Sequence, residues 1–479
     1  MTSALYNIDH IIVLMLENRS FDSMLGRLYP PSPGFDGLTG KEVNKGEAGS
    51  DIAVWNSPGT DNVTMTIPDP DPGELWSDIN AQLFGDKATS PWPAASMSGF
   101  ALNYLAQGAA AGKQYDARKV MHYFKPDQVP VLSKLARQFA VCDRWFASAP
   151  CQTWPNRFFI HTGTALGYEN NSPPHFPYTM ETIFNRFELA GDIDWRIYFH
   201  DIAQSKTLSK LWLLAEKFRF FEEFKKDAAL GELPAYSFIE PRYFADFAMP
   251  NDQHPPHNVT LGEQLIADVY NSLRNGKAWT KTLLIITYDE HGGCFDHVSP
   301  PSAVPPSTIA TAPFNFDRYG VRVPAVLVSP YIQQSTVLRP PGDAPYDHTS
   351  VIATLRARFP QLGPPLTDRD SGAPNVGNAL TLAGPTNMGP DWIEALPYAA
   401  SPTAVANTHS SPLNGMQEGL VSLAANLPTA AVGVGKVAVP EHVAAVRLQN
   451  YEPPPEALEN VQKASAYVRQ ELGRFFRPV

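Results

Sequence analysis

The stretch Thr282-Leu-Leu-Ile-Ile-Thr-Tyr-Asp-Glu-His-Gly-Gly293 decides the fold class of this chain. Residues 282–288 form a nearly continuous apolar run, which is typical of a strand buried on both faces of a parallel sheet. Asp289, Glu290 and His291 follow at once, and ligands in such folds bind beyond the carboxyl ends of the strands. Buried carboxylates beside an imidazole are costly unless a metal ion or a proton transfer uses them. The run therefore predicts a parallel sheet and the place in it where chemistry occurs.

Further strands and helices alternate along the chain, as expected for a parallel sheet covered on both faces. We predict strands at residues 8–16, 140–146, 195–199, 236–239 and 323–328, and helices at residues 20–25, 130–139, 153–164, 261–273 and 351–358. The predicted fold class is α/β, an α/β/α sandwich with a mainly parallel central sheet. Because 46 of the 479 residues are proline, long ordered loops are expected. Residues 28–100 are expected to be irregular, and residues 365–450, which are rich in Ala, Pro, Gly and Asn, show only weak periodicity.

The chain is divided into a main domain, residues 1–400, and a second part, residues 401–479, with an irregular segment and a helical tail. Apolar or small residues recur at helical spacing in the tail, namely Leu458, Val461, Ser465, Val468, Leu472 and Phe475. We expect this stripe to pack on the main domain. Self-association and contact with a membrane surface are the alternatives.

Composition excludes several classes of protein. A net charge of −11 disfavours a nucleic-acid-binding protein. No apolar run approaches the roughly 20 residues of a membrane span. The start of the chain lacks a basic and apolar leader, so we expect a cytoplasmic protein or an exported one shown without its leader. The three cysteines are expected to be buried thiols, with a Cys142–Cys151 disulfide as the alternative.

Several polar groups supply the candidate site: Glu17-Asn18 after the first strand, Thr153-Trp-Pro-Asn-Arg157 at a helix start, Asp289-Glu290-His291, and His200, His254 and His348. Each has an ordinary alternative, since a threonine before a helix is usually a cap and a lone histidine is usually structural. The carboxyl ends of parallel strands meet at one edge of a sheet, and this convergence favours a functional reading.

The chemistry of these groups suits phosphate. Four oxygen ligands are available for one hard divalent cation, Ca²⁺, Mg²⁺ or Mn²⁺, from Glu17, Asn18, Asp289 and Glu290. Thr153 would be activated by that metal, because a free hydroxyl is a weak nucleophile. The start of its helix offers N–H groups to an anion, and Asn156 offers an amide donor to a phosphate oxygen. The histidines can protonate a leaving group.

Five motifs occur in the order seen in one protein family: Glu17-Asn-Arg-Ser-Phe-Asp22, Thr153-x-Pro-Asn-Arg157, His254-Pro-Pro256, Thr287-Tyr-Asp-Glu-His-Gly-Gly293 and Asp347-His-Thr-Ser350. The chain resembles the bacterial phospholipase C / acid phosphatase A phosphoesterases, which include the plant non-specific phospholipases C and belong to the alkaline phosphatase superfamily. The resemblance covers roughly residues 5–360.

The resemblance implies an alkaline-phosphatase-like sandwich with a metal site. It implies metal binding by Glu17, Asn18, Asp289 and Glu290, with Thr153 as a further ligand and as the nucleophile that forms a phosphothreonine. Asn156 matches the phosphate-oxygen donor; His254 and His291 match active-site histidines, and His200 matches less well. Arg157 is expected to brace its helix, and His348 to support the site from behind.

One departure concerns residues 71–74. Family members often carry a Pro-Gly-His segment before the nucleophile, whereas this chain reads Asp71-Pro72-Gly73-Glu74. A phosphate donor or leaving-group acid is therefore missing or replaced at Glu74.

The expected substrate is a phospholipid or a small phosphoester. We favour a phospholipase C acting on phosphodiester head groups, with transient membrane contact, and the alternative is a broad-specificity acid phosphatase acting on monoesters. A sulfatase and a non-catalytic binding module are less favoured, because threonine is not the usual sulfatase precursor and the ligand set is complete. Aromatic residues are expected either to line a head-group pocket or to be ordinary packing, namely Trp154, Tyr178, Tyr243, Tyr288 and Phe295. Head group, metal identity and oligomeric state are not determined by these motifs.

Overall fold

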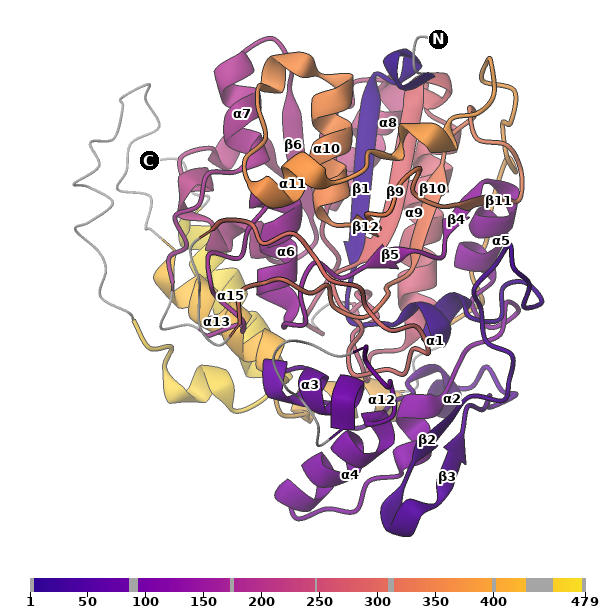
Figure 1. The fold of residues 1–479 in the computed structure, drawn as a ribbon. Coiled ribbons are helices and arrows are strands. Elements are labelled where there is room, and N and C mark those ends of the chain that lie inside the picture. The colour runs from indigo at the N-terminus through magenta and orange to yellow at the C-terminus, as the bar shows by residue number, and fades with distance from the viewer. Residues whose placement is uncertain are drawn as a thin grey trace.

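A computed structural model describes residues 4–85, 94–172, 176–245, 248–308, 314–398, 402–427 and 451–475. An eight-stranded sheet runs through its centre (Figure 1). From edge to edge the strands are β11 (Thr336–Leu338), β4 (Ala140–Cys142), β10 (Ala325–Val328), β9 (Thr282–Tyr288), β1 (His10–Leu16), β8 (Tyr236–Ile239), β6 (Trp195–Phe199) and β7 (Phe218–Phe220). In this sheet β10 alone runs antiparallel to its neighbours. The predicted mainly parallel sheet is confirmed.

The two central strands, β1 and β9, end level with each other. They pair in parallel from His10↔Thr282 to Leu16↔Tyr288, and every residue of β9 is buried. Since the register is fixed over the full length of both strands, Glu17 and Asp289 emerge side by side at the carboxyl edge.

Helices cover both faces of the sheet, which confirms the α/β/α sandwich (Figure 1). One layer contains α6 (Thr153–Thr162), α7 (Ile183–Ala190), α10 (Thr349–Arg358) and α11 (Asp368–Gly372). The other contains α5 (Pro130–Gln138), α8 (Phe221–Leu230) and α9 (Val259–Arg274). A short helix, α1 (Phe21–Leu25), follows β1 and is capped by the Ser20 side chain.

The expectation of irregular structure at residues 28–100 is wrong in part. This region and the residues after it form a small lobe below the sheet in Figure 1, with β2 (Val43–Lys45), β3 (Asp51–Ala53), α2 (Asn62–Met65), α3 (Trp76–Phe84) and α4 (Phe100–Ala110). The lobe has its own hydrophobic core, in which Ile79, Leu83 and Phe100 pack with Phe295. Through Phe295 the lobe is attached directly beyond the end of β9, so its loops reach the carboxyl edge of the sheet.

The region of weak periodicity, residues 365–450, is partly helical where the structure describes it, and residues 428–450 lie outside the described residues. This region contains α11, α12 (Pro402–Ser410) and α13 (Gly415–Asn426). Helix α13 has a capping box between Asn414 and Gln417. The predicted helical stripe of the tail is confirmed from Val461 onward as α15 (Val461–Phe475), whose buried face packs on α13, whereas Leu458 precedes this helix and is exposed.

The single strand predicted at residues 140–146 is two strands. β4 belongs to the central sheet, while β5 (Trp145–Phe146) pairs with β12 (Tyr346–Asp347) in a separate small sheet. Between β4 and β5, the buried Asp143 carboxylate is bonded by the Arg339 guanidinium at 3.0 and 2.7 Å. This ion pair lies where the chain leaves the apolar sheet, with Asp143 fully buried and Arg339 partly exposed.

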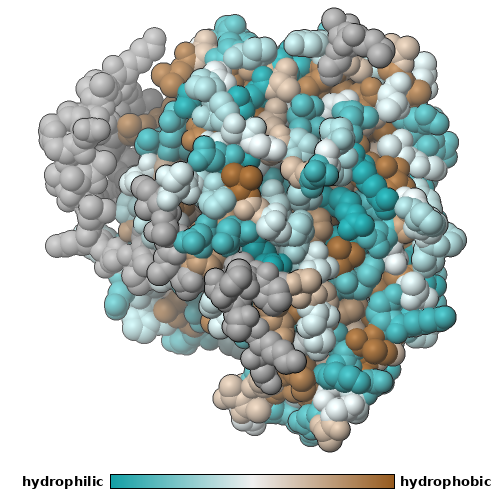
Figure 2. All heavy atoms as spheres, in the orientation of Figure 1, coloured by the Kyte–Doolittle hydropathy of each residue, from teal (hydrophilic) through white to brown (hydrophobic). Residues whose placement is uncertain are grey.

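The cysteines agree with the sequence prediction, because Cys142, Cys151 and Cys294 are all free and buried. Hydrophilic and hydrophobic residues are interspersed on the face of the molecule in Figure 2. Among the described residues, no helix is both long and apolar enough to cross a membrane.

Candidate metal and catalytic site

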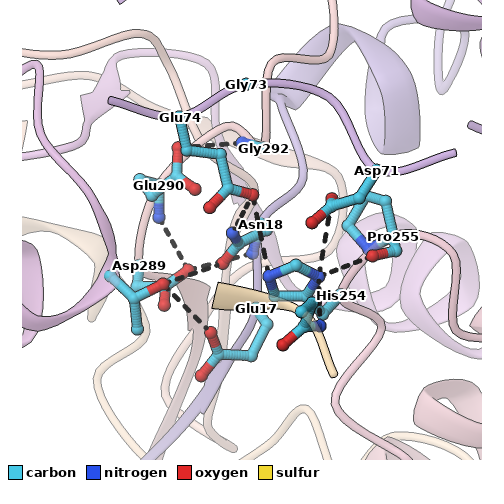
Figure 3. Close-up of polar contacts among 12 residues, drawn as sticks. Glu17, Asn18, Asp71, Gly73, Glu74, His254, Pro255, Asp289, Glu290 and Gly292 are labelled. Atoms are coloured by element: carbon cyan, nitrogen blue, oxygen red, sulfur yellow. Dashed lines mark hydrogen bonds and ion pairs between the residues drawn. The ribbon is translucent and has the colours of Figure 1, made fainter. Parts of the chain in front are cut away.

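The carboxyl ends of β1 and β9 bring Glu17, Asn18, Asp289 and Glu290 together (Figure 3). The backbone N–H groups of Asn18 and Glu290 donate to Asp289 Oδ1 at 2.9 and 2.8 Å. Asn18 adopts φ +50°, a left-handed conformation that asparagine tolerates better than most residues. All four side chains are fully buried.

Residues behind the four side chains fix their orientation. Arg157 donates from Nη2 to Glu17 Oε1 at 2.5 Å and from Nε to Asp289 Oδ2 at 3.3 Å. His348 Nε2 lies 2.6 Å from the Asp289 carbonyl oxygen. Gln204 Nε2 donates to Glu17 Oε1 at 2.7 Å. Arg157 thus braces two candidate ligands as well as its own helix, and His348 lies where the sequence predicted.

Thr153 is the first residue of α6 and is completely buried. Its hydroxyl lies 3.4 Å from Glu17 Oε2 and 3.3 Å from Asn18 Oδ1. These are long hydrogen bonds, so the hydroxyl shares one small space with candidate ligand oxygens without being tightly held by them.

The phosphate-donor role predicted for Asn156 does not fit the structure. Its amide nitrogen donates to the carbonyl oxygens of Ala149, Cys151 and Gln152 at 3.2, 2.8 and 3.2 Å. Its Oδ1 accepts from the Ala149 N–H at 3.0 Å. The side chain is therefore a brace for the loop that precedes Thr153.

The anion-binding role predicted for the start of α6 is weakened in the same way. The Trp154 N–H donates to Asn171 Oδ1 at 2.8 Å, and the Asn156 N–H donates to the Gln152 carbonyl. Pro155 has no N–H to offer. Most of the donors expected at this helix start are already engaged.

His254 reaches the site from the opposite side (Figure 3). Its Nδ1 lies 2.6 Å from the Pro255 carbonyl oxygen, and its Nε2 lies 3.6 Å from Glu74 Oε1. Glu74 in turn accepts from Asn18 Nδ2 at 2.5 Å, and Asp71 lies 3.7 Å from His254 Nδ1. Glu74, which the sequence marked only as a departure, thus contacts a candidate metal ligand. Sequence reasoning did not single out Asp71 as a site residue, because nothing local places it beside residue 254.

His291 lies in the candidate site, whereas His200 lies outside it. His291 lies within the site, with Nδ1 3.1 Å from Glu290 Oε2 and Nε2 2.8 Å from Gln82 Oε1. His200 stacks on Phe221, with ring centroids 4.4 Å apart, and its Nδ1 lies 3.0 Å from the Glu240 carbonyl oxygen. The structure therefore does not bring His200 to the other candidate residues.

The two glycines that follow His291 are required by close packing. Gly292 and Gly293 have φ +60° and +61°, a conformation that glycine adopts without penalty. A Cβ on Gly292 would overlap the Asn18 carbonyl, and one on Gly293 would lie 2.6 Å from Pro72 Cβ. The chain therefore turns sharply at these two glycines. The space is filled by Asn18 and the 71–74 loop.

The five aromatic residues proposed for a head-group pocket are all buried, with exposed fractions of 5% or less. Trp154 packs edge-on against Tyr178, while the hydroxyls of Tyr243 and Tyr288 are bonded to Glu240 and Gln253. The alternative reading, ordinary packing, fits them.

The electrostatics of the site favour a bound cation. Burial raises the pKa of Glu17 well above its usual value, and the Arg157 guanidinium lowers that pKa without cancelling the effect of burial. Burial and Asp289 raise the pKa of Glu290 in the same direction. Glu290 Oε1 is buried and has no hydrogen-bond partner among the described residues. The residues present therefore fit a hard cation, since oxygen ligands without other partners are what such an ion needs.

A cavity of about 570 Å³ opens beside the site. It is lined partly by Gln152 and Leu75, the sequence neighbours of Thr153 and Glu74, and partly by α13 residues such as Gly415 and Gly419. The C-terminal helices therefore form one wall of this cavity, which Thr153 itself does not line.

Comparisons with known proteins agree with this geometry. The model of the Phosphoesterase family matches residues 8–361. Non-specific phospholipase C6 of Arabidopsis thaliana is 36% identical over 433 residues, which cover 87% of this chain and 80% of that protein. Phospholipase C B of Mycobacterium tuberculosis is 30% identical over 435 residues, with 80% and 79% covered.

A solved structure from Vibrio parahaemolyticus, described as a protein in the alkaline phosphatase superfamily, is 13% identical, with 51% of this chain and 64% of that chain covered, at a TM-score of 0.30. The fold and site define a hydrolase built on an α/β sandwich. By the match over most of its length, the chain belongs to the phosphoesterase family.

Proposed function

We propose that this protein is a phospholipase C that hydrolyses phosphodiester head groups of phospholipids through Thr153. The observation that carries the proposal is the position of the Thr153 hydroxyl, 3.4 and 3.3 Å from oxygens of Glu17 and Asn18. Relatives with the printed name phospholipase C support the choice of a lipid diester.

One divalent cation would be held by Glu17, Asn18, Asp289, Glu290 and Thr153. These oxygens suit Ca²⁺, Mg²⁺ or Mn²⁺. Such a cation, when bound, supplies positive charge that activates a nearby hydroxyl and offsets charge on phosphoryl oxygens. Arg157 keeps Glu17 and Asp289 oriented throughout, because it bonds to both.

The reaction consists of two displacements at phosphorus. His254 or His291 takes the hydroxyl proton of Thr153 as Oγ1 attacks phosphorus, the bond to the diacylglycerol oxygen breaks, and the same histidine gives that proton to the departing oxygen. Water then attacks the phosphothreonine, the Thr153–phosphorus bond breaks, and the phosphorylated head group leaves while Thr153 regains its proton. The histidine thus relays protons in both steps: it passes the Thr153 proton to diacylglycerol, and it then passes a proton of the attacking water back to Thr153.

A substrate panel tests the proposal. Wild-type protein with a divalent cation should release phosphocholine from phosphatidylcholine vesicles faster than it hydrolyses p-nitrophenyl phosphate. Thr153→Val, which keeps the shape of the side chain, should lower turnover by at least about 10³-fold. Thr162→Val is the matched control, since Thr162 lies on the same helix and bonds only to the backbone of that segment.

Two results would contradict the proposal. Unchanged turnover in Thr153→Val would exclude Thr153 as the nucleophile. Faster hydrolysis of the monoester than of the lipid would favour the acid phosphatase alternative.

A further inference from the structure

We propose a second divalent-cation site, formed by Asp71, Glu74 and His254, next to the oxygen-ligand site. One potential ligand atom from each residue lies within 4.8 Å of the other two. An ion with bonds of about 2.0–2.6 Å fits between atoms separated by roughly this distance. Neither Asp71 nor Glu74 belongs to the group formed by the ends of β1 and β9.

The unpartnered nitrogen of His254 points to a ligand. The Pro255 carbonyl can only accept a hydrogen bond, so His254 Nδ1, 2.6 Å away, carries the proton. In the neutral ring Nε2 then has a free lone pair, which is the form that binds metals. This atom is buried, has no hydrogen-bond partner among the described residues, and lies 3.6 Å from Glu74 Oε1, another acceptor. A lone pair facing a carboxylate is unfavourable unless a cation lies between them.

The charges around the three residues also require compensation. In the described part of the chain, the only basic side chain within ion-pair distance of Asp71 or Glu74 is His254, whose neutral ring brings no positive charge. The guanidinium of the nearby Arg19 donates to the carbonyl oxygens of Gln253 and Ile67 instead. Placing the buried Glu74 carboxylate beside the half-buried Asp71 carboxylate without a cation is costly.

A comparison within the same protein shows what a filled cluster looks like. Asp22, Asp296 and His297 form another group with metal-like spacing. There the Arg322 guanidinium donates to Asp22 at 3.1 Å and to Asp296 at 3.0 Å, so a positive charge already occupies the centre. Among the residues that the structure describes, no guanidinium or ammonium group forms an ion pair with Asp71 or Glu74.

The donor set indicates the type of ion. Two carboxylates and one imidazole suit Zn²⁺ or Mn²⁺, whereas the neighbouring all-oxygen site suits a harder ion. The Asp71 side chain is 28% exposed, which gives the ion a way in. Asn18 connects the sites, because its Oδ1 faces Thr153 and its Nδ2 bonds Glu74.

A second cation would supply charge that the protein donors do not. The Asn156 amide and most of the α6 N–H groups are engaged elsewhere, so a second cation would add to the positive charge that the first cation supplies beside the phosphoryl oxygens. Ligation also removes His254 from proton transfer and leaves that role to His291. A second cation does not depend on phospholipid being the substrate.

Metal stoichiometry tests the site without using turnover. Purified protein saturated with Ca²⁺ is titrated with Zn²⁺ by calorimetry, and bound metals are counted by mass spectrometry. Wild type should hold one Zn²⁺ per chain in addition to Ca²⁺. Residues that merely support a ligand change metal affinity by about 10–100-fold, so Glu74→Gln and Asp71→Asn should weaken Zn²⁺ binding more than about tenfold while keeping Ca²⁺.

Asp69→Asn is the matched control, because Asp69 is an exposed carboxylate in the same loop and should leave both metals bound. Thermal unfolding of each variant verifies the fold, and the half-buried Asp71 offers the substitution least disturbing to it. Zn²⁺ binding unchanged in both ligand variants would overturn the second site. So would a wild type that holds a single ion, or loss of Ca²⁺ together with Zn²⁺ in Glu74→Gln. If lipid hydrolysis fails while two ions bind, the proposed substrate is wrong and the second site stands.

Discussion

Replacing Asn156 by alanine separates two roles for this residue, brace and phosphate donor. The substitution leaves the buried Ala149 N–H without its acceptor at 3.0 Å and removes the donor to Cys151 O at 2.8 Å. An orphaned buried N–H costs about 1–3 kcal/mol and a lost hydrogen bond about 1 kcal/mol, so we expect a loss of about 2–4 kcal/mol in the free energy of unfolding.

Urea unfolding monitored by circular dichroism measures this loss, alongside kcat at a temperature where the variant remains folded. Asn170→Ala is the matched control: Asn170 accepts one bond, from Ser172 N–H at 3.0 Å, at a half-buried position that water can reach. It should cost less than about 1 kcal/mol. A change below about 1 kcal/mol for Asn156→Ala, combined with a loss of kcat above about 10²-fold, would refute the brace and restore the phosphate-donor reading.

Three further outcomes are expected. Burial alone would lower the pKa of His297, but hydrogen bonds to Asp22 and Asp36 raise this pKa to about 10. The charged His297 therefore stabilises the folded protein fully below the unfolded pKa of about 6.5, and this stabilisation is lost as pH rises through about 10. The free energy of unfolding in urea should decline between pH 6 and 10.5 in the wild type and not in His297→Gln, and parallel curves for the two proteins would contradict this. Gly292→Ala should lower the free energy of unfolding by clearly more than the control Gly191→Ala. Both glycines have positive φ, but only a Cβ at position 292 would meet a backbone carbonyl. Gly191→Ala should cost about 1 kcal/mol, and equal losses in the two variants would argue against the close approach at Gly292. Chelation should abolish activity and lower the unfolding temperature, and added Ca²⁺ or Mn²⁺ should restore both. At a metal concentration of about a hundred times Kd, the free energy of unfolding should increase by about 2.7 kcal/mol. A melting curve that is unchanged by the chelator would count against a bound cation.

Most of the sheet could be predicted because its strands are buried on both faces. The ranges 195–199, 236–239 and 282–288 agree with β6, β8 and β9 residue for residue. The antiparallel direction of β10 was not foreseen, because an apolar run has the same pattern in either direction. Helix α13 was missed although Met416, Leu420 and Leu423 follow helical spacing behind a capping box, a signal obscured by the surrounding proline and glycine.

The candidate site divides in the same way. Glu17 and Asp289 could be placed together from sequence, since each directly follows a central strand. Glu74 and Asp71 could not, because a separate small core carries their loop across to His254. Asn156 and His200 carried the right chemistry, and only their surroundings showed that one braces a loop and the other stacks on Phe221.

The sequence by itself determined the α/β class, the oxygen-rich strand ends and the threonine that faces them, because hydrophobic periodicity and strand termini are local properties of the chain. Only the tertiary structure decided which polar groups remain available for a ligand. That depends on which buried donors and acceptors are satisfied by residues far away in sequence, as Asn18 is by Glu74, 56 positions further on.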